Sequence, residues 1–463
     1  MTLAWTPALP EGDAPVYERL VEALAADIAA GAVRAGDRLP PQRDLAYRLG
    51  VGVGTVTRAY AEAERRGLLR GHVGRGSFVA PPQTPYEGAS PGLLDFARSL
   101  PPSRAAAREI ADTFIRLSRR PGLIERVGYA PPGGFAADRR AGAAWLRQIA
   151  DWPDLDPDQL ICCAGAQQAV AVALGALCRP GDTVICEAAT FAGLKALAAH
   201  MDYRLIGAAM DGEGLTPEGL DQAAATSDAQ VAYVLPVQNP TARVMSPARR
   251  QAIVEVARGR DLMLVEDDLF GAHAGGAGLP ALPSLAALAP DRVFYVSALS
   301  KSLAPGLRVG WLVPPQEGAW RERALAVLQA IALGGPGLGA LVASAWIEDG
   351  SALSLLQANR AELAARTALA LNVLGPAVER PVMAGAPHLW LPMSELDAER
   401  TCGRAARAGL ELTPPEAPII DRAALSGLRL CLGGAPDLAT VERAMLILKT
   451  ALESGEVDRR NVI

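Results

Sequence analysis

The segment Ser297-Ala298-Leu299-Ser300-Lys301-Ser302-Leu303-Ala304-Pro305-Gly306-Leu307-Arg308 says the most about the fold of this chain. It follows an apolar run at residues 292–297 that predicts a buried strand, and its Ser, Pro and Gly residues predict a turn. The chain of 463 residues has only three lysines, Lys195, Lys301 and Lys449, among 45 Lys and Arg residues. Because arginine supplies most of the positive charge but cannot act as a nucleophile, a remaining lysine is predicted to serve through its amine. Lys301, at the end of a strand, is placed to form a Schiff base, whereas Lys195 and Lys449 lie in helical patterns typical of solvated positions.

Apolar runs alternate with helical patterns on both sides of this segment. The expected strands are residues 183–187, 231–236, 262–266, 292–297 and 309–313, with helices at 166–178 and 246–258 between them. Such alternation predicts an α/β fold with a doubly wound, mostly parallel sheet. From about residue 350, a long helical stretch, short strands at 388–392 and 428–432 and a last helix predict a small C-terminal α+β domain.

The first 80 residues form a separate pattern. Helices are expected near 16–28, 44–49 and 55–66, followed by two short strands within 68–79, which together predict a winged helix-turn-helix. Residues 32–80 contain nine Arg and four acidic residues, although the whole chain has a net charge of −5. A basic module in an acidic chain favours contact with phosphate. We therefore expect a DNA-binding domain at 1–80, a proline-containing linker at 81–105 and a large domain at 106–463, with its small subdomain at about 350–463.

Several classes of protein are disfavoured. The six cysteines are scattered without a CxxC pair and the chain has four His, so reduced thiols and no metal site are expected. Residues 324–346 are nearly free of polar groups, but Gly334-Gly335-Pro336-Gly337 interrupts them, which predicts burial rather than a membrane span. Residues 1–13 lack the basic and apolar regions of a signal peptide, so a cytoplasmic location is expected.

The N-terminal module closely resembles the DNA-binding domain of the GntR family. The resemblance rests on Leu39-Pro40-Pro41-Gln42-Arg43-Asp44-Leu45-Ala46, on Leu49-Gly50-Val51, on Thr55-Val56 with Ala59-Tyr60, and on Gly74-Arg75-Gly76-Ser77-Phe78-Val79. It implies double-stranded DNA as a partner and a DNA contact at Arg43. Further contacts are implied at the start of the recognition helix and in the wing, where the polar candidates are Thr55, Thr57, Arg58, Arg70 and Arg75.

The recognition helix departs from the family pattern. Gly52 and Val53 stand where the family usually has Ser or Thr followed by Arg, so two hydrogen-bonding groups are missing. We expect weak affinity for each half-site and useful binding only by a dimer. For any single arginine, a solvated helix face without a DNA contact is an equally good interpretation.

The Lys301 segment resembles the cofactor-lysine motif of fold-type-I aminotransferases, and three other segments agree with it in the expected order. These are Val237-Gln238-Asn239-Pro240-Thr241, Glu266-Asp267-Asp268-Leu269-Phe270-Gly271 and Gly165-Ala166-Gln167. The resemblance implies pyridoxal 5′-phosphate as the cofactor, with a hydrogen bond from Asn239 to its ring hydroxyl and pairing of Asp267 with its ring nitrogen. Gly165, Ala166 and Gln167 at a helix N-terminus, with Ser300 and Arg308, would hold the phosphate.

Other positions of this resemblance concern the ring, the partner subunit and the substrate. Phe191 corresponds to the aromatic residue that stacks on the ring, and Tyr129 to a Tyr that reaches the partner subunit's phosphate. Arg429 corresponds to the Arg that pairs with a substrate carboxylate. Phe270 stands where the motif has Tyr, which removes a hydrogen bond to the cofactor. Together with Ala298 and Ala242, which replace a Ser and a Gly, this departure bears on the speed of transamination rather than on attachment of the cofactor.

The two modules in one chain resemble the MocR subfamily, which implies a head-to-tail homodimer. The favoured function is a transcription regulator that binds the cofactor through a lysine Schiff base and senses an amino compound or the cofactor itself. The alternative is a working aminotransferase in which Lys301, Asp267 and Arg429 supply the chemistry. A third possibility, a dimerisation scaffold without cofactor, is disfavoured by the presence of both Lys301 and Asp267.

Overall fold

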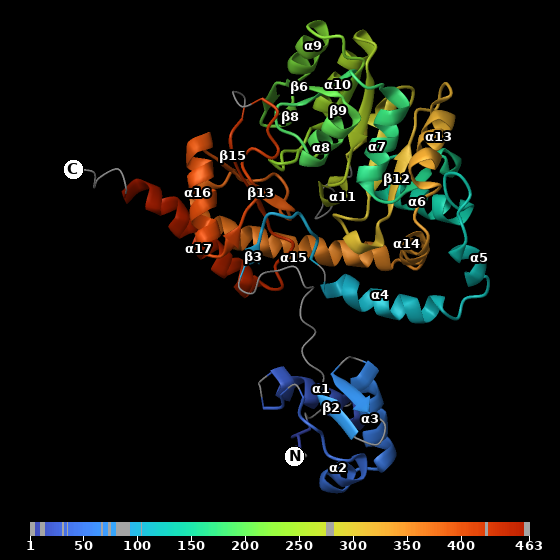
Figure 1. The fold of residues 1–463 in the computed structure, drawn as a ribbon, viewed down its shortest axis with the longest axis vertical. Helices are drawn as coiled ribbons and strands as arrows, with labels where there is room; N and C mark the ends of the chain where they lie inside the picture. The colour runs from blue at the N-terminus through green and yellow to red at the C-terminus, as the bar shows by residue number, and fades with distance from the viewer. Residues whose placement is uncertain are drawn as a thin grey trace. The chain divides into compact units, whose positions relative to one another are not determined.

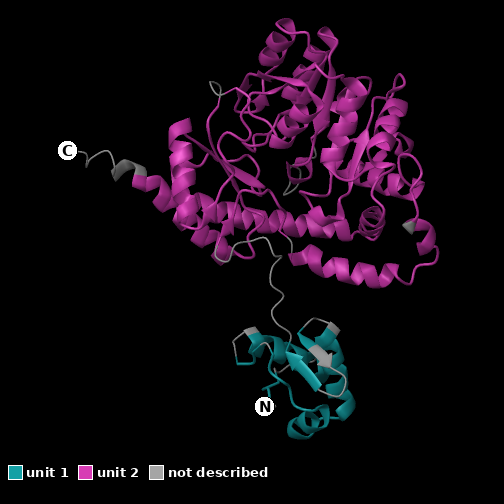
Figure 2. Cartoon of the chain, in the orientation of Figure 1, with its two compact units in different colours: residues 1–91 teal, residues 92–463 magenta. Residues whose placement is uncertain are grey.

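The computed structural model describes residues 5–9, 14–29, 32–34, 36–65, 68–72, 76–79, 93–102, 104–274, 282–421 and 425–457. The chain forms two compact units, residues 1–91 and residues 92–463 (Figure 2). Each unit has its own buried apolar core.

Unit 1 contains three helices and a two-stranded sheet. Its elements are α1 (Val16–Ala29), α2 (Gln42–Leu49), α3 (Val53–Arg65), β1 (Leu69–His72) and β2 (Gly76–Val79). Gly50 ends α2 in the left-handed conformation, at φ +65°, which only glycine adopts without strain. Leu20, Leu45 and Tyr60, one from each helix, are buried together in the core. The predicted winged helix-turn-helix is confirmed, although α3 begins two residues earlier than expected.

The large part of unit 2 is built on a seven-stranded sheet. Its strands, in spatial order, are β4 (Ile161–Cys163), β12 (Gly310–Val313), β11 (Val293–Ala298), β10 (Met263–Asp267), β9 (Val231–Val234), β5 (Thr183–Glu187) and β6 (Arg204–Ala208). All neighbouring pairs are parallel except those of β12, which runs antiparallel to β11 and β4. The predicted doubly wound, mostly parallel sheet is confirmed; β4 and β6 were not among the predicted strands.

Helices cover both faces of the sheet (Figure 1). Helices α7 (Ala166–Leu177), α8 (Ala192–Met201) and α13 (Trp320–Ala332) pack on one face. Helices α6 (Ala136–Ile149), α9 (Pro217–Ala225), α10 (Pro247–Gly259), α12 (Leu285–Leu288) and α14 (Leu338–Glu348) pack on the other. The remaining elements of this part are α4 (Arg104–Leu117), α5 (Leu123–Val127), α11 (Gly271–Ala274), β7 (Met210–Asp211), β8 (Gly214–Leu215) and the 3-10 turns η1 (Pro157–Gln159) and η2 (Pro305–Leu307).

The apolar stretch 324–346 forms most of α13 and most of α14, with the predicted break between them. In α14, Leu341, Val342 and Trp346 are buried in the core on the α6 side of the sheet. Among the residues that the structure describes, no helix is both long enough and apolar enough to cross a membrane.

The small domain lies at the end of a long helix, α15 (Ser351–Leu374), which runs from α14 to α17 (Figure 1). Its other elements are the 3-10 turn η3 (Gly375–Ala377), β13 (His388–Pro392), α16 (Glu395–Arg407), β14 (Leu410–Glu411), β15 (Gly427–Cys431) and α17 (Leu438–Val457). Strands β13 and β15 pair antiparallel, close to the two strands predicted for this region. The small α+β domain is thus present.

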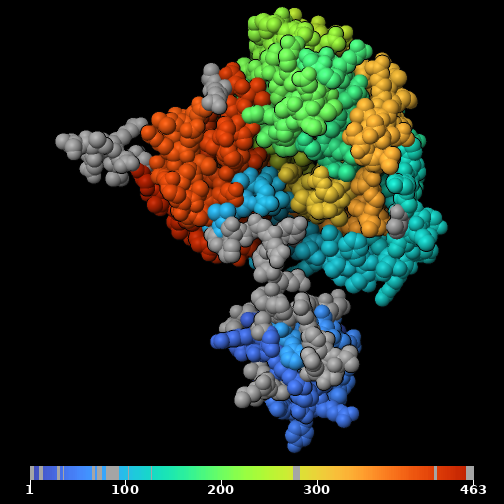
Figure 3. Space-filling view, in the orientation of Figure 1, coloured from blue at the N-terminus to red at the C-terminus, as the bar shows by residue number. Residues whose placement is uncertain are grey.

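An additional strand of the small domain comes from the region expected to be linker. Strand β3 (Leu94–Asp95) pairs parallel with β14, and residues 93–102 lie against the small domain (Figure 3). A Cβ atom on Gly433 would lie only 1.7 Å from the Leu100 carbonyl oxygen, so the two backbones approach closely. A two-residue strand carries no periodic pattern, which is why the sequence does not distinguish it from linker.

Candidate functional site

Lys301 lies in the turn that follows β11. Its Nζ atom donates to the carbonyl oxygen of Ser99 at 2.7 Å. The turn is fixed by two residues that sequence reasoning missed: the His273 ring nitrogen Nε2 lies 2.9 Å from the Lys301 carbonyl oxygen, and Asn359 donates to the Ser302 carbonyl oxygen at 2.9 Å. Burial, with Arg429 and Arg308 nearby, lowers the pKa of the Lys301 amine. A lower pKa increases the neutral, nucleophilic fraction of the amine near pH 7.

Asp267 ends the neighbouring strand β10 and is 3% exposed. Tyr233, on β9, donates its hydroxyl to Oδ2 of Asp267, and the ring is fully buried. The other oxygen, Oδ1, is buried and has no hydrogen-bond partner in the described structure. Burial raises the pKa of Asp267 to about 7, while the hydrogen bond from Tyr233 acts in the opposite direction. The sequence signal for Tyr233 is a phenol in a buried strand, which needs a polar partner.

The end of the site predicted to hold phosphate is formed by Gly165 and Arg308. Gly165 precedes α7 with φ +86°, and a Cβ atom there would lie 2.8 Å from Arg308 Nη2. The same guanidinium nitrogen donates to the Ala164 carbonyl oxygen at 2.9 Å. The hydroxyls of Ser300 and Thr190 are buried without a partner among the described residues. Buried polar atoms of this kind are normally satisfied by a ligand or water.

The first turns of α7 and α8 carry the other predicted cofactor residues. Ala166 is buried at the start of α7, and the exposed Gln167 donates its side-chain amide to the Gly193 carbonyl oxygen at 3.0 Å. Phe191 directly precedes α8 and is half-buried. A Cβ atom on Gly193 would lie 2.4 Å from the Phe191 ring, so the glycine allows the ring to lie against the helix backbone. Gln167 and Phe191 are more than twenty positions apart in the chain, and only folding brings them together beside Gly193.

Arg429, on β15, forms a hydrogen-bonded cluster with Asn239. Its Nη1 atom donates to Asn239 Oδ1 at 2.8 Å, and its Nη2 atom donates to the Ala97 carbonyl oxygen at 3.0 Å. Thr413 accepts from Arg429 Nε at 3.1 Å and donates to the same Ala97 carbonyl at 2.9 Å. Sequence reasoning missed Ala97, Ser99 and Thr413 because backbone carbonyls and a single threonine carry no motif. The guanidinium therefore has a neutral backbone acceptor where a substrate carboxylate was expected.

Phe270 is 3% exposed and packs against His388 of β13, with ring centroids 5.1 Å apart at an interplanar angle of 70°. Burial lowers the pKa of His388 to about 3, which keeps the imidazole neutral. An edge contact of this type stabilises by packing and supplies no hydrogen bond. Phe270 thus joins the large part of unit 2 to the small domain.

Three residues lie apart from this group. Tyr129, in the loop between α5 and α6, is 87% exposed in the single chain. Lys195 was expected to be solvated, which is wrong: its Nζ donates to the carbonyl oxygens of Glu416 at 3.0 Å and Ile419 at 2.7 Å. Helix α8 is thereby attached to the small domain, a contact that helical spacing alone does not reveal. Lys449 is exposed, as expected.

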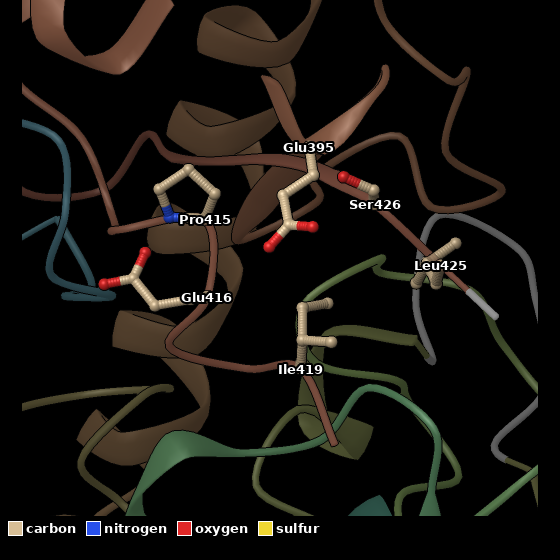
Figure 4. Close-up of a pocket in the computed structure, with 6 residues that line it drawn as sticks. All are labelled: Glu395, Pro415, Glu416, Ile419, Leu425 and Ser426. Atoms are coloured by element: carbon tan, nitrogen blue, oxygen red, sulfur yellow. The ribbon is translucent and has the colours of Figure 1, made fainter. Parts of the chain in front are cut away.

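A shallow pocket next to this attachment is lined by Glu395, Pro415, Glu416, Ile419, Leu425 and Ser426 (Figure 4). The carboxylate of Glu395 points into it, whereas the carboxylate of Glu416 points away from Glu395. It contains none of the predicted cofactor residues, and its acidic groups are unsuited to a phosphate or carboxylate ligand.

In unit 1, the predicted DNA-contacting residues differ in their environments. Arg43 is exposed on α2, and so is Tyr47, 91% exposed, which sequence reasoning missed. Thr57 donates to Gln42 at 2.8 Å, which joins α3 to α2. Arg58 faces α1 instead: its guanidinium lies 4.0 Å from the ring centroid of Tyr17.

The other predicted DNA-contacting residues are Thr55, Arg70 and Arg75. Thr55 is half-buried near the start of α3. Arg70 lies in β1 opposite Phe78, with its side chain outside the described residues, and Arg75 lies outside them entirely.

Two family models match the chain. Residues 96–444 match the family described as aminotransferase class I and II, and residues 16–79 match the family described as bacterial regulatory proteins, gntR family. The chain belongs to the aminotransferase class I and II family. With its GntR domain in the same chain, it is a member of the MocR subfamily.

Relatives of this MocR chain are named HTH-type transcriptional regulators. It is 28% identical over 320 residues to the uncharacterized HTH-type transcriptional regulator YdeF of Bacillus subtilis, covering 68% of each chain. It is 28% identical over 335 residues to the HTH-type pyridoxine biosynthesis transcriptional regulator PdxR of Corynebacterium glutamicum, covering 71% of each.

Solved structures agree in fold. The α-aminoadipate aminotransferase LysN of Thermus thermophilus superposes with a TM-score of 0.70 and 24% identity, covering 79% of this chain and 93% of that one. A multiple substrate aminotransferase of Thermococcus profundus gives a TM-score of 0.71 and 22% identity, covering 80% and 93%. The family and the fold imply pyridoxal phosphate as the cofactor. The unpartnered oxygens of Asp267, Ser300 and Thr190 and the cradle at Gly165 fit that cofactor.

Proposed function

We propose that this MocR-type chain is a transcription regulator whose cofactor site senses an amino compound that carries a carboxylate. The observation that carries the proposal is that Arg429 and Lys301 both donate to one short backbone segment, to the carbonyls of Ala97 and Ser99. This segment is where the chain enters unit 2. Residues 80–92, directly before it, connect it to the DNA-binding unit.

The chemistry of Arg429 favours a carboxylate ligand. A planar guanidinium binds a carboxylate through two parallel hydrogen bonds, which are stronger than a bond to a neutral carbonyl. Arg429 Nη2 donates to the Ala97 carbonyl oxygen at 3.0 Å. A ligand carboxylate would therefore compete with this carbonyl for the same donor. The ligand's amine is expected at Lys301, since bound pyridoxal phosphate supplies an aldehyde that reacts reversibly with primary amines.

A ligand carboxylate that competes for Arg429 would change the hydrogen bonds of the backbone segment that contains Ala97 and Ser99. Besides Arg429, the Ala97 carbonyl accepts only from Thr413 and, weakly, from the Cys431 thiol among the described residues. The neighbouring Phe96 stays paired with Glu411 and Cys431 through its backbone. Loss of one charged hydrogen bond would shift the segment without detaching it. Allosteric coupling of roughly 1–3 kcal/mol is typical of such a change.

The test uses the full chain loaded with pyridoxal phosphate and a panel of amino acids, each with a matched amine that lacks the carboxylate. Visible absorbance reports on reaction of the amine, and fluorescence anisotropy reports on affinity for DNA from upstream of the chain's own gene. We expect a subset of amino acids, but not the matched amines, to change the DNA affinity, and Arg429→Gln to abolish that change. A DNA affinity that no amine alters, yet that differs between protein with and without cofactor, would instead make the cofactor itself the effector.

One set of observations favours the second candidate, an aminotransferase. Lys301, Asp267 and Arg429 are all present, and the charges of Asp267 and Arg429 both act on the Lys301 amine. Phe270 in place of Tyr and the occupied Arg429 favour slow turnover. Rapid multiple turnover with a common amino donor and keto acid, without an effect on DNA affinity, would establish the enzyme and contradict the regulator.

We propose that two copies of the chain form a homodimer through the surface that carries Tyr129. Exposed apolar side chains gather there: Ile124 is 83% exposed, Tyr129 87%, Leu333 67% and Leu338 52%. Gly334, between the last two, lies against the backbone of Ala130, which brings these segments together. A second copy would bury this surface, and a patch of this kind is typical of a subunit interface.

Analytical ultracentrifugation tests the dimer. Leu333→Glu is expected to shift the protein to monomer and to weaken binding of pyridoxal phosphate, since Tyr129 would no longer reach a partner. Val382→Glu, at an apolar residue that is 71% exposed in the small domain, is the matched control and should leave the dimer intact. A wild-type monomer at micromolar concentration would contradict the proposal.

A further inference from the structure

Tyr233 and Asp267 lie on adjacent parallel strands of the sheet. In the register of β9 and β10, Tyr233 pairs with Val265, which is two residues before Asp267. Residues i and i+2 of a strand point to the same face, so Tyr233, Val265 and Asp267 share the face covered by α7. A long side chain can contact its diagonal neighbour on the adjacent strand. The Tyr233 hydroxyl donates to Asp267 Oδ2 in this way.

This hydrogen bond leaves the carboxylate with one free oxygen. The pKa of Tyr233 is raised well above 10 by burial, so the phenol stays protonated and donates. Oδ2 of Asp267 is the acceptor, and Oδ1 is buried without a partner in the described part of the chain. An unpaired buried oxygen is costly unless a ligand donates to it. The protonated ring nitrogen of the cofactor is a donor of the required kind.

The other charged groups around Asp267 oppose one another. Asp268, next in the chain, raises the pKa of Asp267, and Lys301 lowers it. Glu187, from β5, has its own pKa raised to about 8 by burial, to which the charge of Asp267 adds. Among these groups, only Tyr233 donates a side-chain hydrogen bond to Asp267; the backbone N–H of Leu269 also lowers the pKa of this carboxyl.

We propose that Tyr233 is a positioning residue of the cofactor site: its hydroxyl binds Oδ2 of Asp267, favours the ionised carboxylate and reserves Oδ1 for the ring nitrogen of pyridoxal phosphate. The proposal concerns retention of the cofactor and does not depend on which effector the chain senses. It adds to the site a residue that carries none of the motifs around Lys301.

A second tyrosine provides a matched control. Tyr295, on β11, is equally buried and donates to Oδ2 of Asp268 at 2.9 Å. Tyr295, the partner of Asp268, is buried in the core on one face of the sheet, whereas Tyr233 is buried in the core on the other face. Tyr233→Phe and Tyr295→Phe each remove one hydroxyl that binds a buried carboxylate, but only Tyr233 is bonded to the carboxylate of the cofactor site.

The experiment measures the dissociation constants of two ligands by absorbance titration of the full chain: pyridoxal phosphate and its 1-deaza analogue, in which carbon replaces the ring nitrogen. Tyr233→Phe is expected to weaken pyridoxal phosphate binding roughly ten-fold, as for loss of a hydrogen bond to a charged group, and to leave binding of the analogue unchanged. Tyr295→Phe should change neither constant. Equal weakening of both ligands by Tyr233→Phe, no weakening of either, or an equal effect of Tyr295→Phe would overturn the proposal.

A second measurement avoids variants that fail to fold. Incorporation of 3-fluorotyrosine at position 233 keeps the shape of the ring and makes the hydroxyl a stronger donor. It should change the affinity for pyridoxal phosphate and not that for the deaza analogue. An unchanged ratio of the two affinities would overturn the proposal, as would wild-type protein that binds both ligands equally well.

Discussion

Arg429 donates to Oδ1 of Asn239 at 2.8 Å, although 190 residues separate them in the chain. Asn239 follows a strand of the large sheet, and Arg429 belongs to β15 of the small domain. Arg429, which is expected to bind the effector, is therefore hydrogen-bonded to Asn239, which is expected to bind the cofactor ring. Occupation of either is expected to affect the other, because networks of this kind respond as a unit.

Thr413→Val is expected to loosen residues 93–102. The hydroxyl of Thr413 donates to the Ala97 carbonyl and accepts from Arg429, so its loss removes about 1 kcal/mol of local stability. Hydrogen exchange at the backbone amides of this segment should become several-fold faster. The control is Thr401→Val, at a buried threonine of α16 whose hydroxyl accepts from Arg404. Unchanged exchange in the Thr413 variant would argue against a role in holding the segment.

Lys301→Ala is expected to abolish the visible absorbance of protein reconstituted with pyridoxal phosphate. Lys301 is the lysine at the site, and alanine cannot form the covalent bond to the cofactor. Absorbance spectra after removal of free cofactor provide the measurement, with Lys449→Ala, at an exposed lysine, as the control. A variant that keeps the wild-type band would contradict the assignment of Lys301.

Gly165→Ala is expected to weaken cofactor binding strongly, at least ten-fold. An alanine there would have φ near +86° and a Cβ atom 2.8 Å from Arg308 Nη2, which would displace the guanidinium. Gly181→Ala is the matched control, since Gly181 has φ +91° but a Cβ atom added there would meet nothing within 4 Å. Both variants should lose about 1 kcal/mol of stability. If they lost cofactor affinity equally, the cause would be backbone strain and not the phosphate cradle.

Arg43→Ala is expected to reduce DNA affinity and to lower the slope of log affinity against log salt by about 1, the effect of one lost phosphate contact. A reduced discrimination between DNA sequences would instead indicate a base contact. Arg140→Ala, at an exposed arginine of α6, makes the same change in net charge outside the DNA-binding unit. An Arg43 variant that matches this control at every salt concentration would contradict the predicted contact.

Glu187→Gln is expected to stabilise the protein relative to wild type as the pH rises. Burial raises the pKa of Glu187 from 4.5 to about 8, so between these values the folded state holds a proton that the unfolded state releases. The contribution of Glu187 to stability is therefore present below pH 4.5 and lost as pH rises to about 8, with a slope of up to about 1.4 kcal/mol per pH unit. Glutamine does not titrate, and its side-chain oxygen still accepts from the backbone N–H of Leu235.

Urea unfolding of wild type and Glu187→Gln at pH 5 and pH 8 provides this measurement. The free energy of unfolding of the variant minus that of wild type should be larger at pH 8 than at pH 5. His273 and His388, whose pKa values burial lowers, are present in both proteins, so their effects cancel in the difference. A difference that does not change with pH would mean that Glu187 is ionised throughout the range.

The sequence alone was sufficient for the class of fold, and its chemical motifs singled out the candidate residues of the site. The strand before Lys301 follows from a run of apolar residues. The end of α2 at Gly50 follows from a backbone conformation that few residue types adopt. Asp267 is singled out by a motif at the end of β10, Asn239 by a motif that follows β9 and Arg429 by a motif within β15, and the roles assigned to them stay predictions. The scarcity of lysine singled out Lys301 without any structure.

Only the tertiary structure decided what each of these residues contacts. Lys301 and Arg429 donate to the carbonyls of Ser99 and Ala97, and backbone carbonyls are the same in every sequence. Lys195 has the helical spacing of a solvated residue, but packing of the small domain gives it two acceptors. Tyr233 acquires its partner from strand register, which hydrophobic pattern does not specify between two fully buried strands. Contacts between residues distant in sequence depend on how whole elements pack, and that is where this cofactor site is completed.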